Sequence, residues 1–223
     1  MHDTSHPQAG TAAEYKGPRL RTSVARTAEA LQNDYLHSTQ HNKQARARAV
    51  LAQLRKYSAV RLEQHPVALE EVLLLLEPAL SEQEMGKGAA PSASELAAFQ
   101  ALTMLGIHLQ SASTEAHIKG QSFARACGRF YAHSQSQSTK PRFDAMLVSS
   151  DEASRLIHIR SLVTLLRGEN LGFDYGAFAQ DLRVLGSKNA TQKAHTQRQG
   201  VLLKWARDFA LGSYASSQTE PTS

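Results

Sequence analysis

The histidines, the single cysteine and the acidic clusters are the residues of this 223-residue chain that could carry catalytic or metal chemistry. His37 and His41 would share one face of a helix, but two ligands do not complete a metal site and no H-E-x-x-H pattern surrounds them. Cys127 has no second thiol with which to form a disulfide or a zinc ribbon, and a lone cysteine is typical of a reducing compartment. We therefore predict no catalytic centre and no metal site.

Two further patterns resemble sites but favour simpler interpretations. Residues 85–91 contain G-K-G without the G-x-x-x-x-G-K-S/T spacing that wraps a phosphate, so we expect a loop. A run of glutamates is predicted to be the solvated face of an amphipathic helix and not a metal site. This run comprises Glu70, Glu71, Glu77, Glu82 and Glu84. The sequence thus predicts a protein that is not an enzyme and needs no cofactor.

Basic residues form the clearest chemical pattern in the chain. Residues 119–210 hold 14 Lys and Arg against 7 Asp and Glu, whereas residues 1–118 hold 11 against 12. A surplus of positive charge that is confined to one half of the chain is typical of a surface that binds a polyanion. Few aromatic side chains are expected to be exposed, so the predicted binding is directed at the phosphate backbone and is sensitive to salt.

Several of these cations repeat at helical spacing. Arg48 and Arg55 are seven residues apart, as are Arg160 and Arg167, so each pair would lie on one flank of a helix. Rows of positively charged side chains suit phosphates, which occur at regular intervals along a strand. Neither Arg160 nor Arg167 has an acidic residue four positions before it with which to form an ion pair along the helix. From this spacing and the helical faces we assign a nucleic-acid-binding role to three residues: Arg129, Arg167 and Lys204.

The elements that must position these cations are all helices, because apolar residues recur with helical period and almost never alternate. We predict an all-α fold of two small helical bundles packed together, the second an antiparallel bundle with short loops. Ser94 is expected to cap one helix and Asp174 another, and Ser150 to open a third with Asp151 and Glu152 in its first turn. Gly168 and Gly186 are expected to end helices. The predicted divisions are a flexible leader at 1–22, an N-terminal bundle at 23–118 with a loop at 85–93, a C-terminal bundle at 119–212 and a flexible tail at 213–223.

The distribution of apolar residues also bears on the compartment. The longest apolar run, residues 72–76, is too short to span a bilayer, and the polar first residues lack the apolar core of a signal peptide. We therefore expect a cytoplasmic protein.

Five motifs follow one another along the second half of the chain: S-F-A-R-A-C-G-R-F at 122–130, P-R-F-D-A-M-L at 141–147, I-R-S-L-V-T-L-L-R at 159–167, F-D-Y-G-A-F-A-Q-D-L at 173–182 and L-K-W-A-R-D-F at 203–209. Their order and spacing resemble successive helices of the CasB family, the small subunit of the type I-E CRISPR surveillance complex Cascade. Residues 47–56 and 100–109 resemble the family's first-half helices more loosely. The resemblance covers about residues 45–210.

This resemblance implies two helical bundles and a role without catalysis. Family members sit as a pair along an RNA-guided complex, contact its large subunit and its backbone subunits, and help to hold the displaced and target DNA strands open. The implied partners are therefore other Cascade subunits, a second copy of this chain and the guide RNA–target DNA. Carried over by position, the family's basic groove is lined by Arg55, Lys56, Arg125, Arg142, Arg160 and Arg198. Guide pairing would supply sequence specificity.

One alternative function stays open at this point. The basic face could meet acidic protein partners without touching nucleic acid, which would make the chain a structural adaptor. A nucleic-acid binder loses affinity steeply with salt, whereas such an adaptor would not bind DNA at all.

Overall fold

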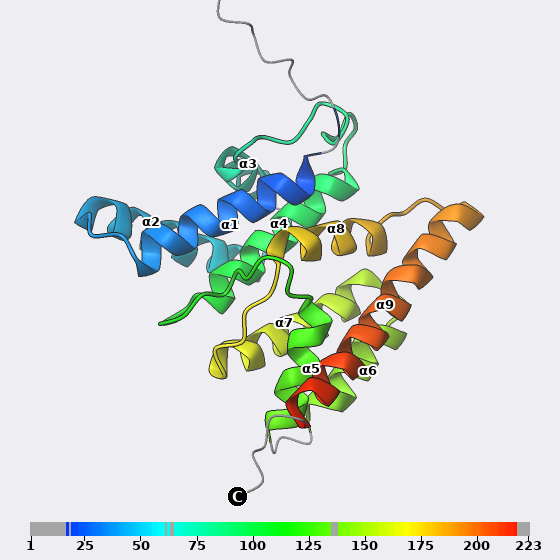
Figure 1. Ribbon diagram of the computed structural model, residues 1–223. Coiled ribbons are helices and arrows are strands. Elements are labelled where there is room, and N and C mark those ends of the chain that lie inside the picture. Colours follow the sequence, from blue (N-terminus) through cyan, green and yellow to red (C-terminus); the bar gives the residue numbers. More distant parts are fainter. Residues whose placement is uncertain (1–16, 18, 61, 63–64, 135–137, 218–223) are drawn as a thin grey trace, which may run out of the picture.

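Helices make up all the regular secondary structure in the part of the chain that the computed structural model describes, which is residues 17, 19–60, 62, 65–134 and 138–217 (Figure 1). The predicted all-α fold is therefore confirmed. The helices are α1 (Leu20–Leu36), α2 (His41–Tyr57), α3 (Pro66–Leu75), α4 (Ala93–His108), α5 (Phe123–His133), α6 (Thr139–Val148), α7 (Glu152–Gly168), α8 (Tyr175–Leu185) and α9 (Gln192–Ser217).

The last helix packs more extensively on α5 than on any other element, and α6 and α7 also pack against each other (Figure 1). Two glycines allow the close approach of α5 and α9. A Cβ atom on Gly128 would lie 2.0 Å from the Phe209 carbonyl oxygen, and one on Gly212 would lie 2.2 Å from the Arg125 carbonyl oxygen. Backbone therefore meets backbone at this crossing, with no space for a side chain from either glycine.

Packing crosses the predicted boundary between residues 118 and 119. Helix α8 packs mainly on α1 and α4, which precede that boundary, and less on α9, which follows it (Figure 1). Leu20 and Val24 of α1 belong to the same buried apolar cluster as Trp205 and Phe209 of α9. One hydrophobic core therefore extends through both halves of the described chain.

An aromatic group lies where the halves meet. Phe123 of α5 makes ring contacts with Phe173, Phe178 and Trp205 at centroid distances of 5.1, 5.0 and 5.5 Å. Phe173 also stacks on Tyr175 at 4.4 Å. All five rings are buried, and tilted or edge-on ring pairs add to the stabilisation from burial itself.

The helix ends follow the expected capping chemistry in all but two places. Asp174 accepts a hydrogen bond from Ala177 N, and α7 ends at Gly168, as predicted. Asp151, and not Ser150, caps α7, because the Asp151 carboxylate accepts from Ser154 N. The prediction for Ser94 is wrong, because Ser94 is buried inside α4. Ser92 begins that helix in a capping box, in which Ser92 Oγ accepts from Glu95 N at 3.0 Å and the Glu95 carboxylate accepts from Ser92 N at 2.6 Å.

Both chain ends are more helical than the sequence predicts. Helix α1 begins at Leu20, so three residues of the predicted leader 1–22 are helical, while 1–16 and 18 lie outside the described residues. Helix α9 continues to Ser217, into the predicted tail 213–223, of which 218–223 are not described. The contact of Gly212 with the α5 backbone explains the longer helix, because packing stabilises turns whose sequence is mainly small and polar.

Glu84 is not on a solvated helix face, which corrects the interpretation of the glutamate run at this residue. It is only 7% exposed, and its carboxylate accepts hydrogen bonds from Arg19 N at 2.7 Å and Leu20 N at 3.0 Å. Ser81 donates to the same carboxylate through its N–H and its hydroxyl. Burial alone would raise the pKa of Glu84, but these hydrogen bonds outweigh it and lower the pKa. Glu84 thus caps α1 from 64 residues away.

Replacing this carboxylate is expected to destabilise the fold. Glu84→Gln keeps one acceptor oxygen but turns an amide N–H₂ toward the remaining donors, so we expect a loss of about 1–2 kcal/mol in the free energy of unfolding. Urea denaturation at pH 7 measures the effect. Glu82→Gln, at an exposed residue of the same loop, is the matched control and should change stability by less than about 0.5 kcal/mol. Equal effects of the two substitutions would contradict the capping role.

Candidate nucleic-acid interface

The nine predicted phosphate-binding cations lie on five helices. Arg55 and Lys56 are in the last turn of α2, where a positive charge also suits the negative end of the helix dipole. The others are Arg125 and Arg129 on α5, Arg142 on α6, Arg160 and Arg167 on α7, and Arg198 and Lys204 on α9. The structure separates these cations into groups with different surroundings.

Five of the nine are not engaged within the described protein: Arg129 and four cations whose nitrogen atoms are not buried without a partner. The side chains of Arg55, Lys56, Arg125 and Arg160 make no hydrogen bond or ion pair with any described residue. Lys56 and Arg125 are exposed, while Arg55 and Arg160 are half-buried. Burial lowers the pKa of the Arg160 guanidinium, which nevertheless stays charged because arginine titrates far above neutral pH. These four cations are available to an anion.

Arg129 is partly sequestered beside the α5–α9 crossing. Its Nε is buried and has no hydrogen-bond acceptor among the described residues. Arg125 lies one helical turn earlier on the same face of α5, and it is exposed. The two arginines therefore place two positive charges about 6 Å apart along α5.

Three other arginines are held by neutral acceptors within the protein. Arg142 donates to the Ser138 hydroxyl and carbonyl, and Arg167 donates to the Gln110 Oε1 at 2.9 Å. Arg198 donates to the Ser187 and Asn189 carbonyl oxygens at 2.9 and 3.0 Å, so it fixes the turn between α8 and α9. Their charges are not neutralised, but their side chains are less free to follow a flexible ligand.

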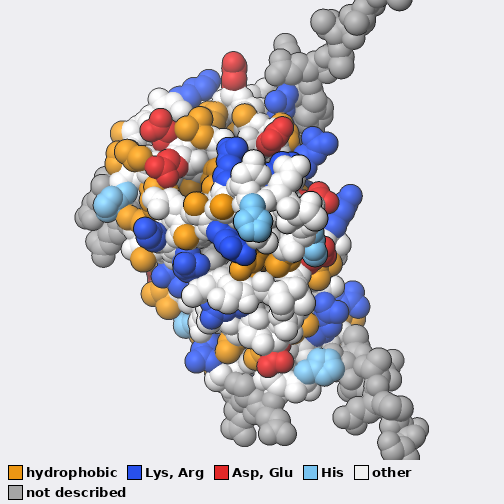
Figure 2. Space-filling view, turned by 90° about the vertical axis from the view of Figure 1, so that its left-hand side faces the viewer, with side chains coloured by type: hydrophobic (Ala, Val, Ile, Leu, Met, Phe, Trp, Pro, Cys, Tyr) orange, Lys and Arg blue, Asp and Glu red, His pale blue; other side chains and the backbone are white. Residues whose placement is uncertain are grey.

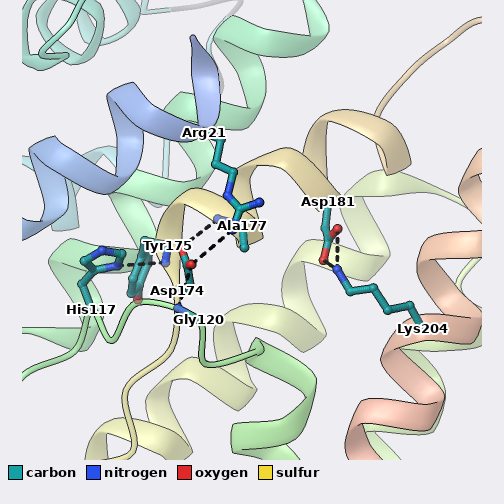
Figure 3. A network of polar contacts seen from close by, with 8 residues as sticks. All are labelled: Arg21, His117, Gly120, Asp174, Tyr175, Ala177, Asp181 and Lys204. Atoms are coloured by element: carbon teal, nitrogen blue, oxygen red, sulfur yellow. Dashed lines mark hydrogen bonds and ion pairs between the residues drawn. The ribbon is translucent and has the colours of Figure 1, made fainter. Parts of the chain in front are cut away.

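Lys204 is neutralised by an acid from a neighbouring helix (Figure 3). Its Nζ lies 2.8 Å from Asp181 Oδ2 on α8, and Trp205 Nε1 donates to the same oxygen at 2.8 Å. This ion pair ties α9 to α8. Of the nine cations, Lys204 is therefore the one whose charge is already opposed.

The nine cations do not form one continuous block. Helices α5, α6 and α7 contact one another, so Arg125, Arg129, Arg142 and Arg160 belong to one group of packed helices, whereas α2 packs on α1 and α4. Figure 1 shows α2 and α9 on opposite sides of the molecule. Figure 2 shows Lys and Arg side chains spread across the middle of one face, interrupted by uncharged ones.

A polar network that the sequence analysis missed joins α1 and α8 to the segment before α5 (Figure 3). Asp174 accepts hydrogen bonds from Ala177 N at 2.9 Å and Gly120 N at 3.0 Å, and the Arg21 guanidinium lies 3.7 Å away. Burial would raise the pKa of Asp174, but the backbone donors and nearby positive groups outweigh it and lower the pKa. Only the capping role of Asp174 had a sequence signal, because its other partners are distant along the chain.

The structure also gives the surroundings of the histidines, the cysteine and the acids considered as chemical groups. The described residues contain no group of three or more His, Cys, Asp and Glu side chains that could hold a metal ion. His37 lies 3.6 Å from Glu115, and Cys127 is buried, which raises the pKa of its thiol and leaves it unreactive. A depression of about 240 Å³ beside Arg167 and Asn170 has only polar and small lining residues. No helix in the described part of the chain is both long and apolar enough to cross a membrane.

The described part of the chain is therefore an all-helical protein. Its candidate site consists of separate lysine and arginine side chains, most of which no acid neutralises. The chain belongs to the Cse2 family: residues 50–209 match the sequence model of CRISPR-associated protein Cse2. This match confirms the resemblance on which the groove residues were assigned. Among proteins with curated functions, none matches the chain in sequence.

Two solved structures have the same fold. The crystal structure of CasB from Thermobifida fusca superposes with a TM-score of 0.62 at 26% sequence identity, covering 85% of this chain and 97% of that one. The crystal structure of a CRISPR-associated protein of the Cse2 family from Thermus thermophilus superposes with a TM-score of 0.55 at 21% identity, covering 84% and 97%. The second likeness bears on the fold alone.

Proposed function

We propose that this chain is a non-catalytic small subunit of an RNA-guided CRISPR interference complex of the Cascade type, in which it binds the DNA backbone and stabilises the opened target and displaced strands. The observation that carries the proposal is the set of unengaged cations on α2, α5 and α7 of a Cse2-family chain. Phosphates are the ligands that such cations attract, and base pairing by the guide would supply the sequence specificity.

The expected mode of binding is backbone contact without base stacking. Tyr57 donates its hydroxyl to Glu71 at 2.6 Å and stacks on Phe99, so its ring is held within the protein. Tyr131 packs against Phe209 at a centroid distance of 5.6 Å. Since both rings already pack against another aromatic ring, with Tyr131 still 41% exposed, contacts to phosphates should dominate and tolerate any sequence.

The nine predicted residues are not expected to contribute equally. Arg55, Lys56, Arg125 and Arg160 should contribute most, because their side chains make no hydrogen bond or ion pair within the described protein and none of their nitrogen atoms is buried without a partner. Arg129, Arg142, Arg167 and Arg198 keep their charge but are partly buried or already hydrogen-bonded. Lys204 should contribute least, because Asp181 neutralises it. The protein partners implied by the family are the other Cascade subunits and a second copy of this chain.

The test is fluorescence-anisotropy binding of the full chain to single- and double-stranded DNA over a salt series. We expect sequence-tolerant binding in which Arg125→Gln with Arg160→Gln lowers the salt slope on double-stranded DNA by about 2, one for each phosphate that the variant no longer neutralises. Lys87→Gln with Lys140→Gln removes the same charge from exposed residues outside the proposed site, one of them paired with Asp144, and should leave the slope nearly unchanged.

The outcomes separate the two functions. No DNA binding by the wild-type chain at low salt would overturn the proposal and favour a structural adaptor for acidic protein partners. Equal slopes for the two double variants would remove Arg125 and Arg160 from the interface.

A further inference from the structure

Every residue of α3 (Pro66–Leu75) except Glu70 and Glu71 is apolar, but only one side of this helix is buried. The opposite side, formed by Val67, Glu70, Glu71 and Leu74, is called the α3 face below. We propose that the α3 face binds another protein subunit of the RNA-guided complex, at a surface that is apolar in its centre and has Lys or Arg at its rim. The inference rests on the proposed function and deepens it, because it assigns a protein-binding face to a chain whose cations are proposed to bind DNA.

The buried side of α3 accounts for how the helix is held. Ala68 and Val72 belong to the hydrophobic core, and α4 is the helix on which α3 mainly packs. The Thr27 hydroxyl of α1 donates to the Leu75 carbonyl oxygen at 3.3 Å and accepts from Glu77 N at 3.0 Å. These contacts use one side of α3 and its C-terminal end. They leave the apolar side chains of the α3 face out of the packing.

Val67 and Leu74 are the apolar part of the α3 face. They are seven residues apart, which is about two helical turns or about 10.5 Å, so they lie on the same side of the helix. Their exposed fractions are 58% and 78%, and neither packs against the core of the described chain. A helix that is apolar on nearly every side is ordinarily buried on nearly every side. The exposure of α3 therefore indicates a surface that a partner covers.

Acidic side chains border this apolar pair. Glu70 and Glu71 follow Val67 by three and four residues, so they lie on opposite flanks of the apolar pair. Glu70 makes no hydrogen bond or ion pair with any described residue. Glu71 accepts a hydrogen bond from the Tyr57 hydroxyl at 2.6 Å, which fixes its position and does not neutralise its charge. The rim of the α3 face is therefore negative.

The charge of this region decides which class of partner fits. Residues 65–86 contain five glutamates and no lysine or arginine. Exposed carboxylates repel phosphates, so the α3 face is unsuited to a nucleic acid. An apolar centre with a polar rim is the usual composition of a protein–protein interface, and Lys or Arg on the partner would complement the glutamates. Figure 1 shows α3 in the upper part of the molecule, away from α5 and α6, so a protein subunit and DNA would bind different parts of the chain.

The experiment uses the full chain, labelled at its N-terminus, and a complex of guide RNA with the remaining Cascade subunits, purified without the small subunit. Val67→Gln with Leu74→Gln removes the apolar part of the α3 face. Val148→Gln with Leu203→Gln is the matched control, because it makes the same two changes at residues of α6 and α9 that are 81% and 55% exposed. Glutamine is a good helix former, so circular dichroism should be unchanged in both variants. Fluorescence anisotropy measures the Kd for the complex, and a salt series measures binding of the isolated chain to DNA.

We expect the α3 double variant to raise the Kd for the complex by about tenfold or more, because it removes the two apolar anchors at the centre of the interface. Its affinity for DNA and its salt slope should stay the same, and the control should change neither quantity. Glu70→Lys should raise the Kd for the complex by about threefold or more, because it repels the cations of the partner. Glu169→Lys makes the same charge change at an exposed residue after α7 and should leave this Kd unchanged.

An α3 double variant that joins the complex as tightly as the wild type would overturn the inference and leave the proposed function standing. Equal losses in the two double variants would also overturn it, because exposed apolar side chains in general would then explain the loss. A fall in DNA binding as large as the fall in complex binding would do the same, because α3 would then belong to the nucleic-acid interface. If the wild-type chain did not join the complex, the proposed function would fail, and the inference with it.

Discussion

Gly128→Ala is expected to lower the free energy of unfolding by about 3 kcal/mol or more, the largest effect we expect from adding a single methyl group. The new Cβ would lie 2.0 Å from the Phe209 carbonyl oxygen, 2.9 Å from its carbonyl carbon and 3.0 Å from Ser213 N, all of which are backbone atoms. Backbone cannot rotate away as a side chain can, so α9 would have to move off α5.

Moving α9 disturbs the core, which explains the size of the effect. Phe209 stacks on Phe143 at a centroid distance of 4.3 Å and is 5% exposed, and Trp205, one turn earlier, is fully buried. In a chain of this length, a loss of 3 kcal/mol should lower the melting temperature by about 6–12 °C. Thermal and urea unfolding followed by circular dichroism measure it.

Gly200→Ala is the matched control, because it lies within α9 and a Cβ there meets no atom within 4 Å. Removing a glycine from an open helical position should stabilise the protein by up to about 1 kcal/mol. The two substitutions add the same atom and are expected to act in opposite directions. A Gly128→Ala protein as stable as the wild type would show that α5 and α9 do not need this close approach.

The α5–α9 crossing also illustrates what the sequence can and cannot predict about the fold. The period of the apolar residues predicts the helices of the second half, Asp174 predicts where α8 begins, and Ser150 predicts the start of α7 to within one residue, because these signals are local. Gly128 lies inside a predicted helix, where an isolated glycine indicates a packing constraint in general terms. The partner that imposes the constraint is about 80 residues away, and no local pattern identifies it.

Long-range contacts account for the predictions that differ from the structure. Glu84 belongs to a run of glutamates that is predicted to be exposed to solvent. It is nevertheless buried, because two backbone N–H groups at the start of α1 need an acceptor. The error at Ser94 has a local cause instead: Ser92 caps α4 because Glu95 is correctly spaced to close the capping box, a signal that the sequence contains. Helix α8 packs on α1 and α4, which sequence order alone does not indicate.

The same distinction between local sequence signals and long-range contacts applies to the candidate site. The nine cations could be selected from charge, helical spacing and family resemblance, since residue type and period are visible in the sequence. Their partners could not: Asp181 opposes Lys204 from α8, and two carbonyl oxygens hold Arg198. Which cations are free for a ligand therefore depends on acceptors that only the tertiary structure brings near.

Acid is expected to destabilise the protein through His108, well above the pH at which carboxylates titrate. His108 is 3% exposed, its Nδ1 lies 2.9 Å from the Tyr175 hydroxyl, and its ring contacts Phe173 at 5.4 Å. Burial, with a smaller contribution from the neighbouring Arg167, lowers the pKa of His108 from 6.5 to about 3, against a backbone interaction with Leu171 that raises it. The folded protein therefore holds this imidazole neutral.

The sign of the effect follows from the unfolded chain, which binds a proton at His108 below about pH 6.5 while the folded chain does not. The contribution of His108 to stability is complete above pH 6.5 and is lost as the pH falls toward 3. Each pH unit in this range costs about 1.4 kcal/mol, so we expect a loss of about 2 kcal/mol between pH 6.5 and 5. Urea denaturation at a series of pH values measures this slope.

His108→Gln should flatten the slope, because glutamine can still hydrogen-bond to Tyr175 but does not titrate. Some slope should remain, since burial also lowers the pKa of His117, which accepts a hydrogen bond from Tyr175 N at 3.0 Å. The lowered pKa values of Glu84 and Asp174 affect stability only below about pH 4.5, outside the measured range. His195→Gln, at an exposed residue, controls for the loss of one histidine.

An unchanged slope in His108→Gln would mean that this imidazole does not stay neutral in the fold. A flattened slope would locate the acid sensitivity at the contact between α4 and α8. That contact, together with the Asp174 network and the aromatic group around Phe123, joins α2 and α4 to the helices that hold Arg125 and Arg160. Protonation of His108 would therefore act at the contact that lies between the two sets of cations.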